Sequence, residues 1–295
     1  TAYDPDENTY VFYDSVRNIL YHDLEGRDPG NRDDYYDESP LKDDDNIWTS
    51  DGATRIVELY KSLSGTYDYY LKTIGLLSYD GNGGQVSAFV RDGDQSGNNA
   101  FNYGPFSVDK HNVTHLSFGS NISLSYGIVG HEYTHAIQRG IISSLVYSGE
   151  TGTLMEGYSD IGGQLTRLYW GDRNDDAKWS SDGKRNITNP FDSKYKSADG
   201  SFVSLSQPKA YKGVYYYRCG NPSDVNDYGW IHHNSTVLSH AIYNIYTLGI
   251  NDITELTELL YRTWSYLHST AGFYEYRMAI LAAAKDMKLS TEKMR

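Results

Sequence analysis

The sequence predicts an α+β protein with two lobes, a β-rich lobe over residues 1–125 and a mainly helical lobe over residues 126–295. Two observations predict this division. Short runs of β-branched and aromatic residues, bounded by turn-forming residues, dominate the first half. In the second half, apolar residues recur at intervals of three and four, as on the buried face of a helix. Because 295 residues are enough for two packed lobes, we expect a cleft between them.

The first lobe is expected to contain several short strands and one long helix. The helix is predicted over residues 53–75, where apolar residues follow helical spacing until Gly75 ends the pattern. The strands are predicted at Tyr10–Ser15, Asn18–Asp23, Gly84–Asp94 and Thr114–Ser120.

The second lobe is expected to be built from five helices. Asp252 followed by Glu255 is a capping-box pattern, which indicates where one of these helices begins. An irregular stretch rich in Gly, Ser and Asn lies between residues 171 and 227. The helices are predicted at Tyr126–Arg139, Thr153–Trp170, His233–Leu248, Asp252–Leu267 and Ala271–Lys288.

The composition excludes two classes of partner. No run of about 18 apolar residues occurs, so no membrane span is expected. The net charge of −13 would repel phosphate backbones, so we expect no binding to nucleic acid. Cys219 is the only cysteine, so no internal disulfide can form.

The segment GHEYTHAIQRG indicates a metal site on a helix. His131 and His135 are four residues apart, so their imidazoles lie on one helical face and can bind one zinc ion. Glu132 lies about 100° around the helix. It is therefore poorly placed as a ligand but well placed to act as a base toward a water molecule at the metal.

A zinc site requires a third protein ligand, and Glu156 is the candidate. Gln138 and Ile141 stand where an extended H-x-x-G-x-x-H motif would need Gly and His, so that class of site is excluded. Glu156 and Asp160, four residues apart, could respectively bind the metal and accept a hydrogen bond from a ligand histidine. Glu150 is a competing acid, but it lies in a turn-like stretch that would hold it loosely.

Further stretches resemble the thermolysin-like neutral metalloproteases. NNAF at residues 98–101 resembles the strand that pairs with extended substrate in that family, which implies that Asn99 and Ala100 bind substrate. Tyr147 stands where the family places a hydrogen-bond donor. DYGWIHHNS at residues 227–235 resembles the segment with the family's catalytic histidine, which implies that role for His232 and an orienting role for Asp227.

The resemblance implies a two-lobed zinc endopeptidase with its active-site helix at the cleft. One catalytic zinc would activate a water molecule, with Glu132 as the base. The protein is expected to be secreted, although no signal peptide is present in this chain, and to be a monomer matured from a precursor with a propeptide. An apolar side chain at P1′ would enter a pocket near Ile122, Ile128 and Phe202. The alternative is a zinc-stabilised peptide-binding module of the same fold with weakened catalysis.

Two departures from the family concern the surroundings of the zinc ligands. Val203 stands where we align the family's arginine, which binds a substrate carbonyl and supports the ligand carboxylate. Loss of that arginine is what makes the binding-module alternative conceivable. Met155 replaces the asparagine that usually orients the second ligand histidine, so His135 needs another partner.

A third departure concerns calcium. Gly127 and Arg167 stand where the family places carboxylates of a double calcium site, so no calcium pair is expected. Arg167 could instead pair with an acid of the segment that contains Asp172, Asp175 and Asp176. A single Ca²⁺ remains possible in the acidic run with Asp43 and Asp45, for which a solvated surface run is the favoured interpretation.

Overall fold

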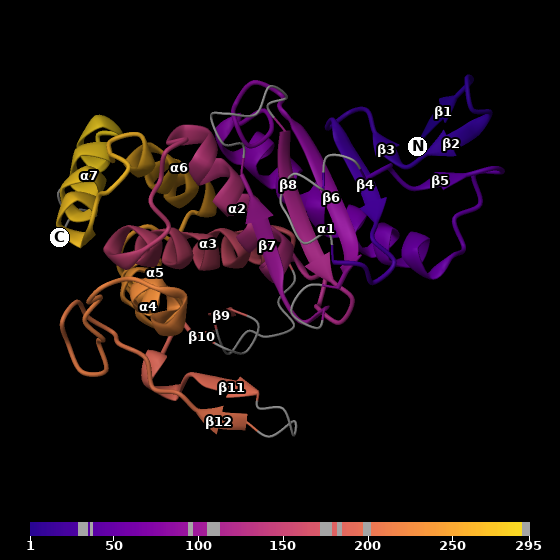
Figure 1. The fold of residues 1–295 in the computed structure, drawn as a ribbon. Helices are drawn as coiled ribbons and strands as arrows, with labels where there is room; N and C mark the ends of the chain where they lie inside the picture. Colours follow the sequence, from indigo (N-terminus) through magenta and orange to yellow (C-terminus); the bar gives the residue numbers. More distant parts are fainter. Residues whose placement is uncertain are drawn as a thin grey trace. The chain divides into compact units, whose positions relative to one another are not determined.

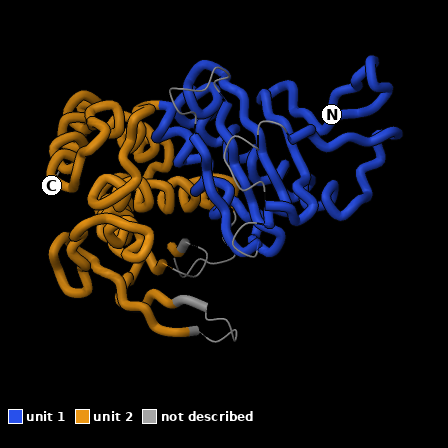
Figure 2. The backbone as a smooth tube through the Cα atoms, viewed as in Figure 1, with its two compact units in different colours: residues 1–140 blue, residues 141–295 orange. Residues whose placement is uncertain are grey.

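The computed structural model describes residues 1–28, 35, 38–93, 97–104, 113–171, 179–181, 185–196 and 202–290. The chain divides into two compact units, Thr1–Gly140 and Ile141–Arg295 (Figure 2). This division comes later than the expected one after residue 125, because helix α2 (Tyr126–Ile141) packs with the first unit. There the hydroxyl groups of Tyr70 and Thr134 lie 2.8 Å apart and are both buried.

The first unit is built on a five-stranded mixed sheet (Figure 1). The three central strands are parallel, with Ile19 opposite Val86 and Val86 opposite Thr114. Both edge strands are antiparallel to their neighbours. The order across the sheet is β3 (Tyr13–Asp14), β4 (Ile19–Asp23), β6 (Gln85–Asp92), β8 (Val113–Gly119) and β7 (Ala100–Tyr103). A smaller antiparallel sheet has the order β1 (Ala2–Asp4), β2 (Thr9–Val11) and β5 (Lys42–Asp43).

Helix α1 (Asp51–Ile74) packs against β4 and β6, as the helical spacing of its apolar residues requires. The Ser50 side chain caps the helix by accepting a hydrogen bond from the Ala53 amide at 3.1 Å. Gly75 ends it with φ of +70°, a conformation that favours glycine, and its amide donates to carbonyls of the last turn. The helix predicted over residues 53–75 is therefore confirmed.

The second unit is a bundle of helices around α3 (Gly149–Tyr169), which contacts each of the other four. The Tyr158 ring packs against Trp264, with ring centroids 5.4 Å apart and both residues buried. Asp252 caps α6 as predicted, accepting a hydrogen bond from the Glu255 amide at 2.9 Å. The surrounding helices are α4 (Asp227–Asn234), α5 (Thr236–Leu248), α6 (Ile253–Trp264) and α7 (Phe273–Asp286).

The irregular stretch between α3 and α4 contains short strands and single turns. A hydrogen bond from the Leu205 amide to the Ser193 carbonyl, 2.8 Å long, continues the pairing of β11 with β12. No helix in the described part of the chain is both long enough and apolar enough to cross a bilayer. The elements are β9 (Ser180–Ser181), β10 (Arg185–Asn186), η3 (Pro190–Asp192), β11 (Lys194–Lys196), β12 (Phe202–Ser204) and η4 (Asp224–Asn226).

Candidate metal centre and catalytic group

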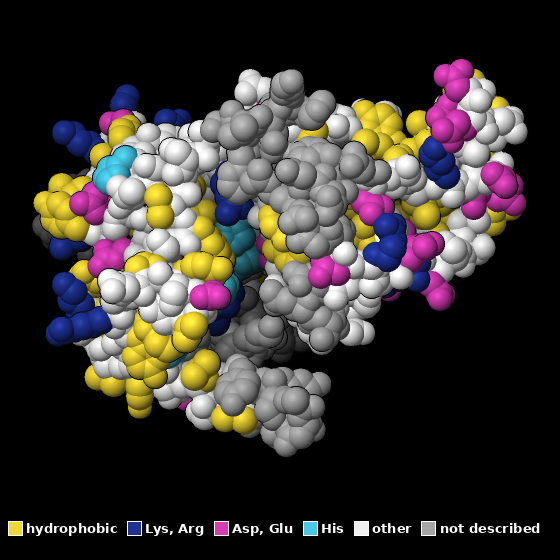
Figure 3. All heavy atoms as spheres, in the orientation of Figure 1, with side chains coloured by type: hydrophobic (Ala, Val, Ile, Leu, Met, Phe, Trp, Pro, Cys, Tyr) yellow, Lys and Arg dark blue, Asp and Glu magenta, His cyan; other side chains and the backbone are white. Residues whose placement is uncertain are grey.

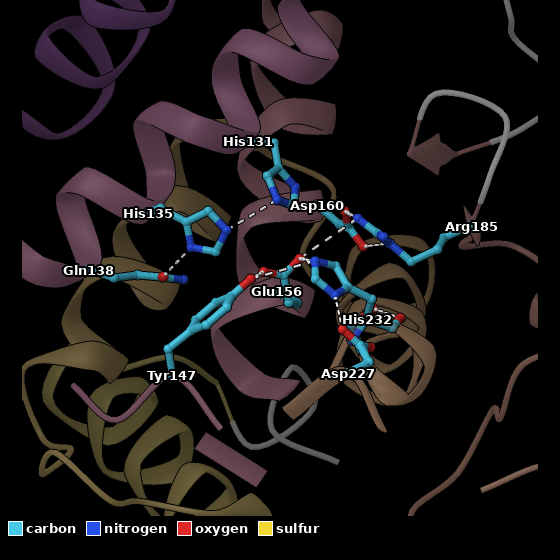
Figure 4. A network of polar contacts seen from close by, with 10 residues as sticks. His131, His135, Gln138, Tyr147, Glu156, Asp160, Arg185, Asp227 and His232 are labelled. Carbon is cyan, nitrogen blue, oxygen red and sulfur yellow. Dashed lines mark hydrogen bonds and ion pairs between the residues drawn. The ribbon is translucent and has the colours of Figure 1, made fainter. Parts of the chain in front are cut away.

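Helix α2 holds His131 and His135 on one face, as the spacing of four predicts. Their Nε2 atoms lie 3.1 Å apart (Figure 4). Two nitrogens bound to one tetrahedral zinc at 2.0–2.1 Å would be separated by roughly 3.3–3.4 Å, so the observed geometry is close to that of a ligand pair. His131, His135 and Glu156 each offer one ligand atom, and these three atoms lie within 4.8 Å of one another. Two imidazoles and one carboxylate are a donor set that suits zinc.

Gln138 is the partner that the sequence left unidentified for His135. Its Oε1 lies 3.1 Å from His135 Nδ1, one helical turn further along α2, and both side chains are buried (Figure 4). With the proton on Nδ1, His135 donates to Gln138 and keeps the Nε2 lone pair for a metal. The sequence could have predicted this contact between Gln138 and His135, because residues three apart on a helix are neighbours.

Glu156 lies on α3 and is fully buried. The following residue, Gly157, allows this close packing, because a Cβ there would lie 2.6 Å from the Ser235 carbonyl oxygen. We had expected the competing acid Glu150 to be held loosely, and this expectation was wrong. It lies in the first turn of α3, where its carboxylate accepts hydrogen bonds from the Tyr211 hydroxyl at 2.6 Å and the Phe273 amide at 3.1 Å.

Asp160 is paired with an arginine that the sequence analysis missed. Arg185 Nε and Nη2 donate to the two Asp160 oxygens at 2.7 and 2.6 Å, and Nη2 lies 3.9 Å from Glu156 Oε2 (Figure 4). The expected loss of an arginine that supports the ligand carboxylate was therefore wrong. Arg185 on β10 supplies a guanidinium group beside this carboxylate, whereas Val203 is an exposed residue of β12.

Tyr147, His232 and Asp227 form a connected group with Glu156 within the second unit. The Tyr147 hydroxyl donates to Glu156 Oε1 and lies 3.5 Å from His232 Nε2, which is itself 3.3 Å from Glu156 Oε2. Asp227 accepts two hydrogen bonds from His232, from Nδ1 at 2.7 Å and from the amide at 2.9 Å. Burial opposes protonation of His232, but the Glu156 and Asp227 carboxylates outweigh it and raise its pKa above the usual value.

A left-handed turn positions His232. Four consecutive residues at the start of α4, Asp227 to Trp230, have φ between +51° and +96°. This conformation is unfavourable for non-glycine residues such as Tyr228 and Trp230, and strained backbone of this kind concentrates at functional sites. Here the turn brings the Asp227 carboxylate back to the amide and ring of His232.

The remaining predicted site residues lie on defined elements. Glu132 is buried on α2, beside His131 in the sequence. Asn99 directly precedes β7, which Ala100 opens, and β7 is an edge strand of the described sheet. Ile128 is buried on α2. Phe202 belongs to β12, but its side chain lies outside the described part of the chain, so the expected pocket near it stays a prediction.

The residues of the calcium prediction lie on both units. Gly127 is in the first turn of α2, and Arg167 is in the last turn of α3, where its Nη1 lies 3.5 Å from Gln164 Oε1. Its expected partners Asp172, Asp175 and Asp176 lie outside the described residues. Asp43 accepts hydrogen bonds from the amides of Asp45 and Ile47, both at 3.0 Å, which organise the exposed acidic run.

Comparison with known proteins gives matches along nearly the whole chain. The family model "Thermolysin metallopeptidase, catalytic domain" matches residues 1–139, and "Thermolysin metallopeptidase, alpha-helical domain" matches residues 143–294. The thermostable neutral protease NprT of Geobacillus stearothermophilus is 31% identical over 85% of this chain and 45% of its own length. Thermolysin of Alicyclobacillus acidocaldarius is 30% identical with the same coverages. This chain thus spans about half the length of these curated relatives.

Comparison of structures agrees on the fold. The precursor of protealysin, a metalloproteinase from Serratia proteamaculans, aligns with a TM-score of 0.68. The alignment covers 94% of this chain and 84% of that chain at 18% identity. The expected α+β architecture, with a β-rich first part and a helical second part, is confirmed.

Proposed function

This chain belongs to the thermolysin metallopeptidase family, and from that premise we propose that it is a zinc-dependent endopeptidase acting on extended polypeptides. One observation carries the proposal: His131, His135 and Glu156 offer three ligand atoms within 4.8 Å of one another. Glu132 directly follows His131 on α2, and His232 Nε2 lies 3.3 Å from Glu156 Oε2. A single zinc ion fits this donor set.

Each residue of the proposed site has a defined task. Zinc, when bound, supplies a Lewis acid that polarises the scissile carbonyl and acidifies a water molecule. Glu132 takes the proton of the attacking water and delivers it to the departing amine. Tyr147 and His232, which already converge on the Glu156 carboxylate, donate to the oxygen on which negative charge develops. Asp227 holds the His232 ring by accepting from its Nδ1.

Arg185 weakens the alternative of a catalytically impaired binding module. That alternative depended on the loss of an arginine beside the zinc-ligand carboxylate. The guanidinium group of Arg185 is paired with Asp160 and lies 3.9 Å from Glu156, so the positive charge is present. Buried carboxylates that are neutralised in this way remain ionised, which a metal ligand requires.

Family resemblance supports a substrate position, a route of maturation and a choice of metals for this protein. Substrate would pair with edge strand β7 near Asn99 and Ala100, and an apolar P1′ side chain would lie near Ile128 and Phe202. We further propose secretion as a monomer and maturation from a precursor, for which the likeness to a precursor structure is the support. Zinc would be the catalytic metal, and any calcium would occupy a single site near Asp43 rather than a double site.

The decisive test combines metal analysis with a peptide substrate. The purified protein should contain one zinc per chain and should hydrolyse an internally quenched peptide. Chelation should abolish hydrolysis, and added zinc should restore it. Stoichiometric zinc that resists removal, with no cleavage of casein or of a peptide library, would instead support the binding module.

A further inference from the structure

A pocket of about 670 Å³ in the second unit adjoins the catalytic group but has no role in the proposed chemistry. His232, Asp227 and Arg185 are among the residues that line it. Trp230 and His233 of α4 also line it, together with residues of the irregular stretch before α4 that include Lys194 and Arg218. A molecule in this pocket would therefore lie next to the proposed oxyanion donor.

The charges in the pocket wall are unbalanced. Arg185 is neutralised by Asp160, and Asp227 is paired with His232. Lys194 and Arg218 are exposed, and neither forms an ion pair with any residue that the structure describes. Among the residues that the structure describes, these two cations thus line the pocket without an ion-pair partner, in a protein whose net charge is −13. On the face shown in Figure 3, by contrast, acidic and basic side chains are interspersed.

Gln207 adds a buried hydrogen-bond acceptor to the same wall. Gln207 is only 3% exposed, and its side-chain Oε1 has no hydrogen-bond partner among the described residues. A buried acceptor without a donor is unfavourable, so an N–H group supplied by a ligand would be stabilising there. Peptide backbones carry such donors, and the pocket therefore offers complementary groups for both an amide N–H and an anion.

The walls of this pocket are held in place before any ligand binds. The Tyr217 backbone is joined to α4 by two hydrogen bonds with the Asn234 side chain, at 3.1 and 2.8 Å. The Tyr217 ring stacks on His233 with centroids 4.2 Å apart and packs edge-on against Trp230. The Gln207 backbone N–H donates to the Pro190 carbonyl oxygen at 2.9 Å. Preorganised walls reduce the entropy lost on binding.

We infer that this pocket is a carboxylate subsite, in which Lys194 and Arg218 bind a carboxylate of the peptide substrate and Gln207 Oε1 accepts a backbone N–H. The inference rests on the proposed endopeptidase function, because the ligand is part of the substrate. An aspartate or glutamate side chain near the cleaved bond and a free C-terminus offer the same chemistry. The subsite would make the enzyme selective for acidic peptides or for bonds near a C-terminus.

The test uses quenched peptides derived from one neutral parent that the wild-type protein cleaves. In one arm, glutamate replaces glutamine at each position around the cleaved bond. In the other arm, a free C-terminal acid is compared with its amide. Both arms are repeated with Lys194→Met, Arg218→Met and the double variant, and with Lys61→Met as a matched control. Lys61 is an exposed residue of α1 on the first unit.

We expect the wild type to favour the carboxylate-bearing peptide of at least one pair by about five- to twentyfold in kcat/KM, as two ion pairs would give. The preference should fall below about twofold in the double variant and should decrease with salt. It should persist in Lys61→Met. Preference for glutamate identifies a side-chain carboxylate, and preference for the acid over the amide identifies a C-terminus. No preference in the wild type, or one that survives in the double variant, overturns the subsite.

A binding arm separates this inference from the proposed function. Glu132→Gln protein, which should not turn over substrate, is titrated with labelled forms of the same peptides, and anisotropy reports the dissociation constants. The carboxylate-bearing peptide should bind about five- to twentyfold more tightly than its neutral partner. If the wild type fails to cleave any peptide, the proposed function fails. Equal dissociation constants for the two peptides contradict the subsite, whatever the turnover.

Discussion

Removing the Gln138 side-chain amide should weaken zinc binding through His135. The two groups lie 3.1 Å apart and are both buried, so Gln138→Leu removes an acceptor that solvent cannot readily replace. Leaving a buried N–H without its acceptor costs about 1–3 kcal/mol. The metal-free protein can relieve this cost by moving the His135 proton, whereas metal binding requires a free Nε2 and so fixes the proton on Nδ1. The cost therefore falls mainly on the metal-bound state.

The expected result is a zinc affinity lowered by about tenfold to a hundredfold, the range that partners of metal-ligating histidines contribute. Competition with a chromophoric chelator measures this dissociation constant without any activity assay. Gln138→Glu keeps an acceptor and should retain most of the affinity. Gln164→Leu is the matched control, because it removes another buried glutamine side chain, from helix α3. If Gln138→Leu binds zinc as tightly as Gln164→Leu, Gln138 does not position His135.

The catalytic base, a buried ion pair, a buried histidine and the calcium sites can each be tested by one measurement. Glu132→Gln should keep its zinc but lose about 10²- to 10⁴-fold in kcat, because an amide cannot accept the water proton; a tenth of wild-type activity in a peptide assay would exclude Glu132 as the base. Arg185→Met should lower the unfolding free energy of the metal-free protein by about 3–5 kcal/mol, because it leaves buried carboxylates uncompensated. The exposed-pair control Arg262→Met should cost at most about 1 kcal/mol in the same urea titration. Burial lowers the pKa of His22 to about 4, so the unfolded chain takes up a proton first as the pH falls below about 6.5. The stability contributed by neutral His22 is thus complete above that pH and is lost toward pH 4. Between pH 7 and pH 4, the unfolding free energy of His22→Phe should fall by ~3 kcal/mol less than that of the wild type. Equal decreases in the two proteins would show that His22 is not responsible. Finally, calcium removal should leave the melting temperature of the zinc-loaded protein nearly unchanged, and two calcium ions beside Arg167 in a crystal would contradict this.

The local sequence was sufficient for the helices and for the zinc-ligand pair. Helical periodicity and caps depend on residues three or four apart, so α1 with its Gly75 terminus and α6 with its Asp252 cap were predictable. The same periodicity places His131 and His135 on one face of α2, where their Nε2 atoms lie 3.1 Å apart. Gln138 was also within reach of local reasoning, because it lies one turn from His135.

Burial on both faces of the central strands could not be inferred from the strand sequences alone. The segment around β6 was predicted from alternation, which is typical of a strand with one solvent-exposed face. Most of β6 and all of β8 are instead buried, because both are parallel strands inside a mixed sheet. The edge position of β7 likewise depends on its pairing with β8, a long-range property.

The tertiary structure alone determined which distant groups complete the site. Arg185 comes from an irregular stretch with no periodic pattern, yet it reaches both Asp160 and Glu156 on α3. The motif resemblance placed the supporting arginine at Val203, because an irregular stretch has no periodicity that shows which of its residues faces α3. Glu150, interpreted as a loose turn residue, is held by Tyr211 and Phe273 from far along the chain. Periodicity specifies which face of an element is buried, whereas ion pairs between elements depend on chain paths through loops, and those paths are settled only when the whole unit packs.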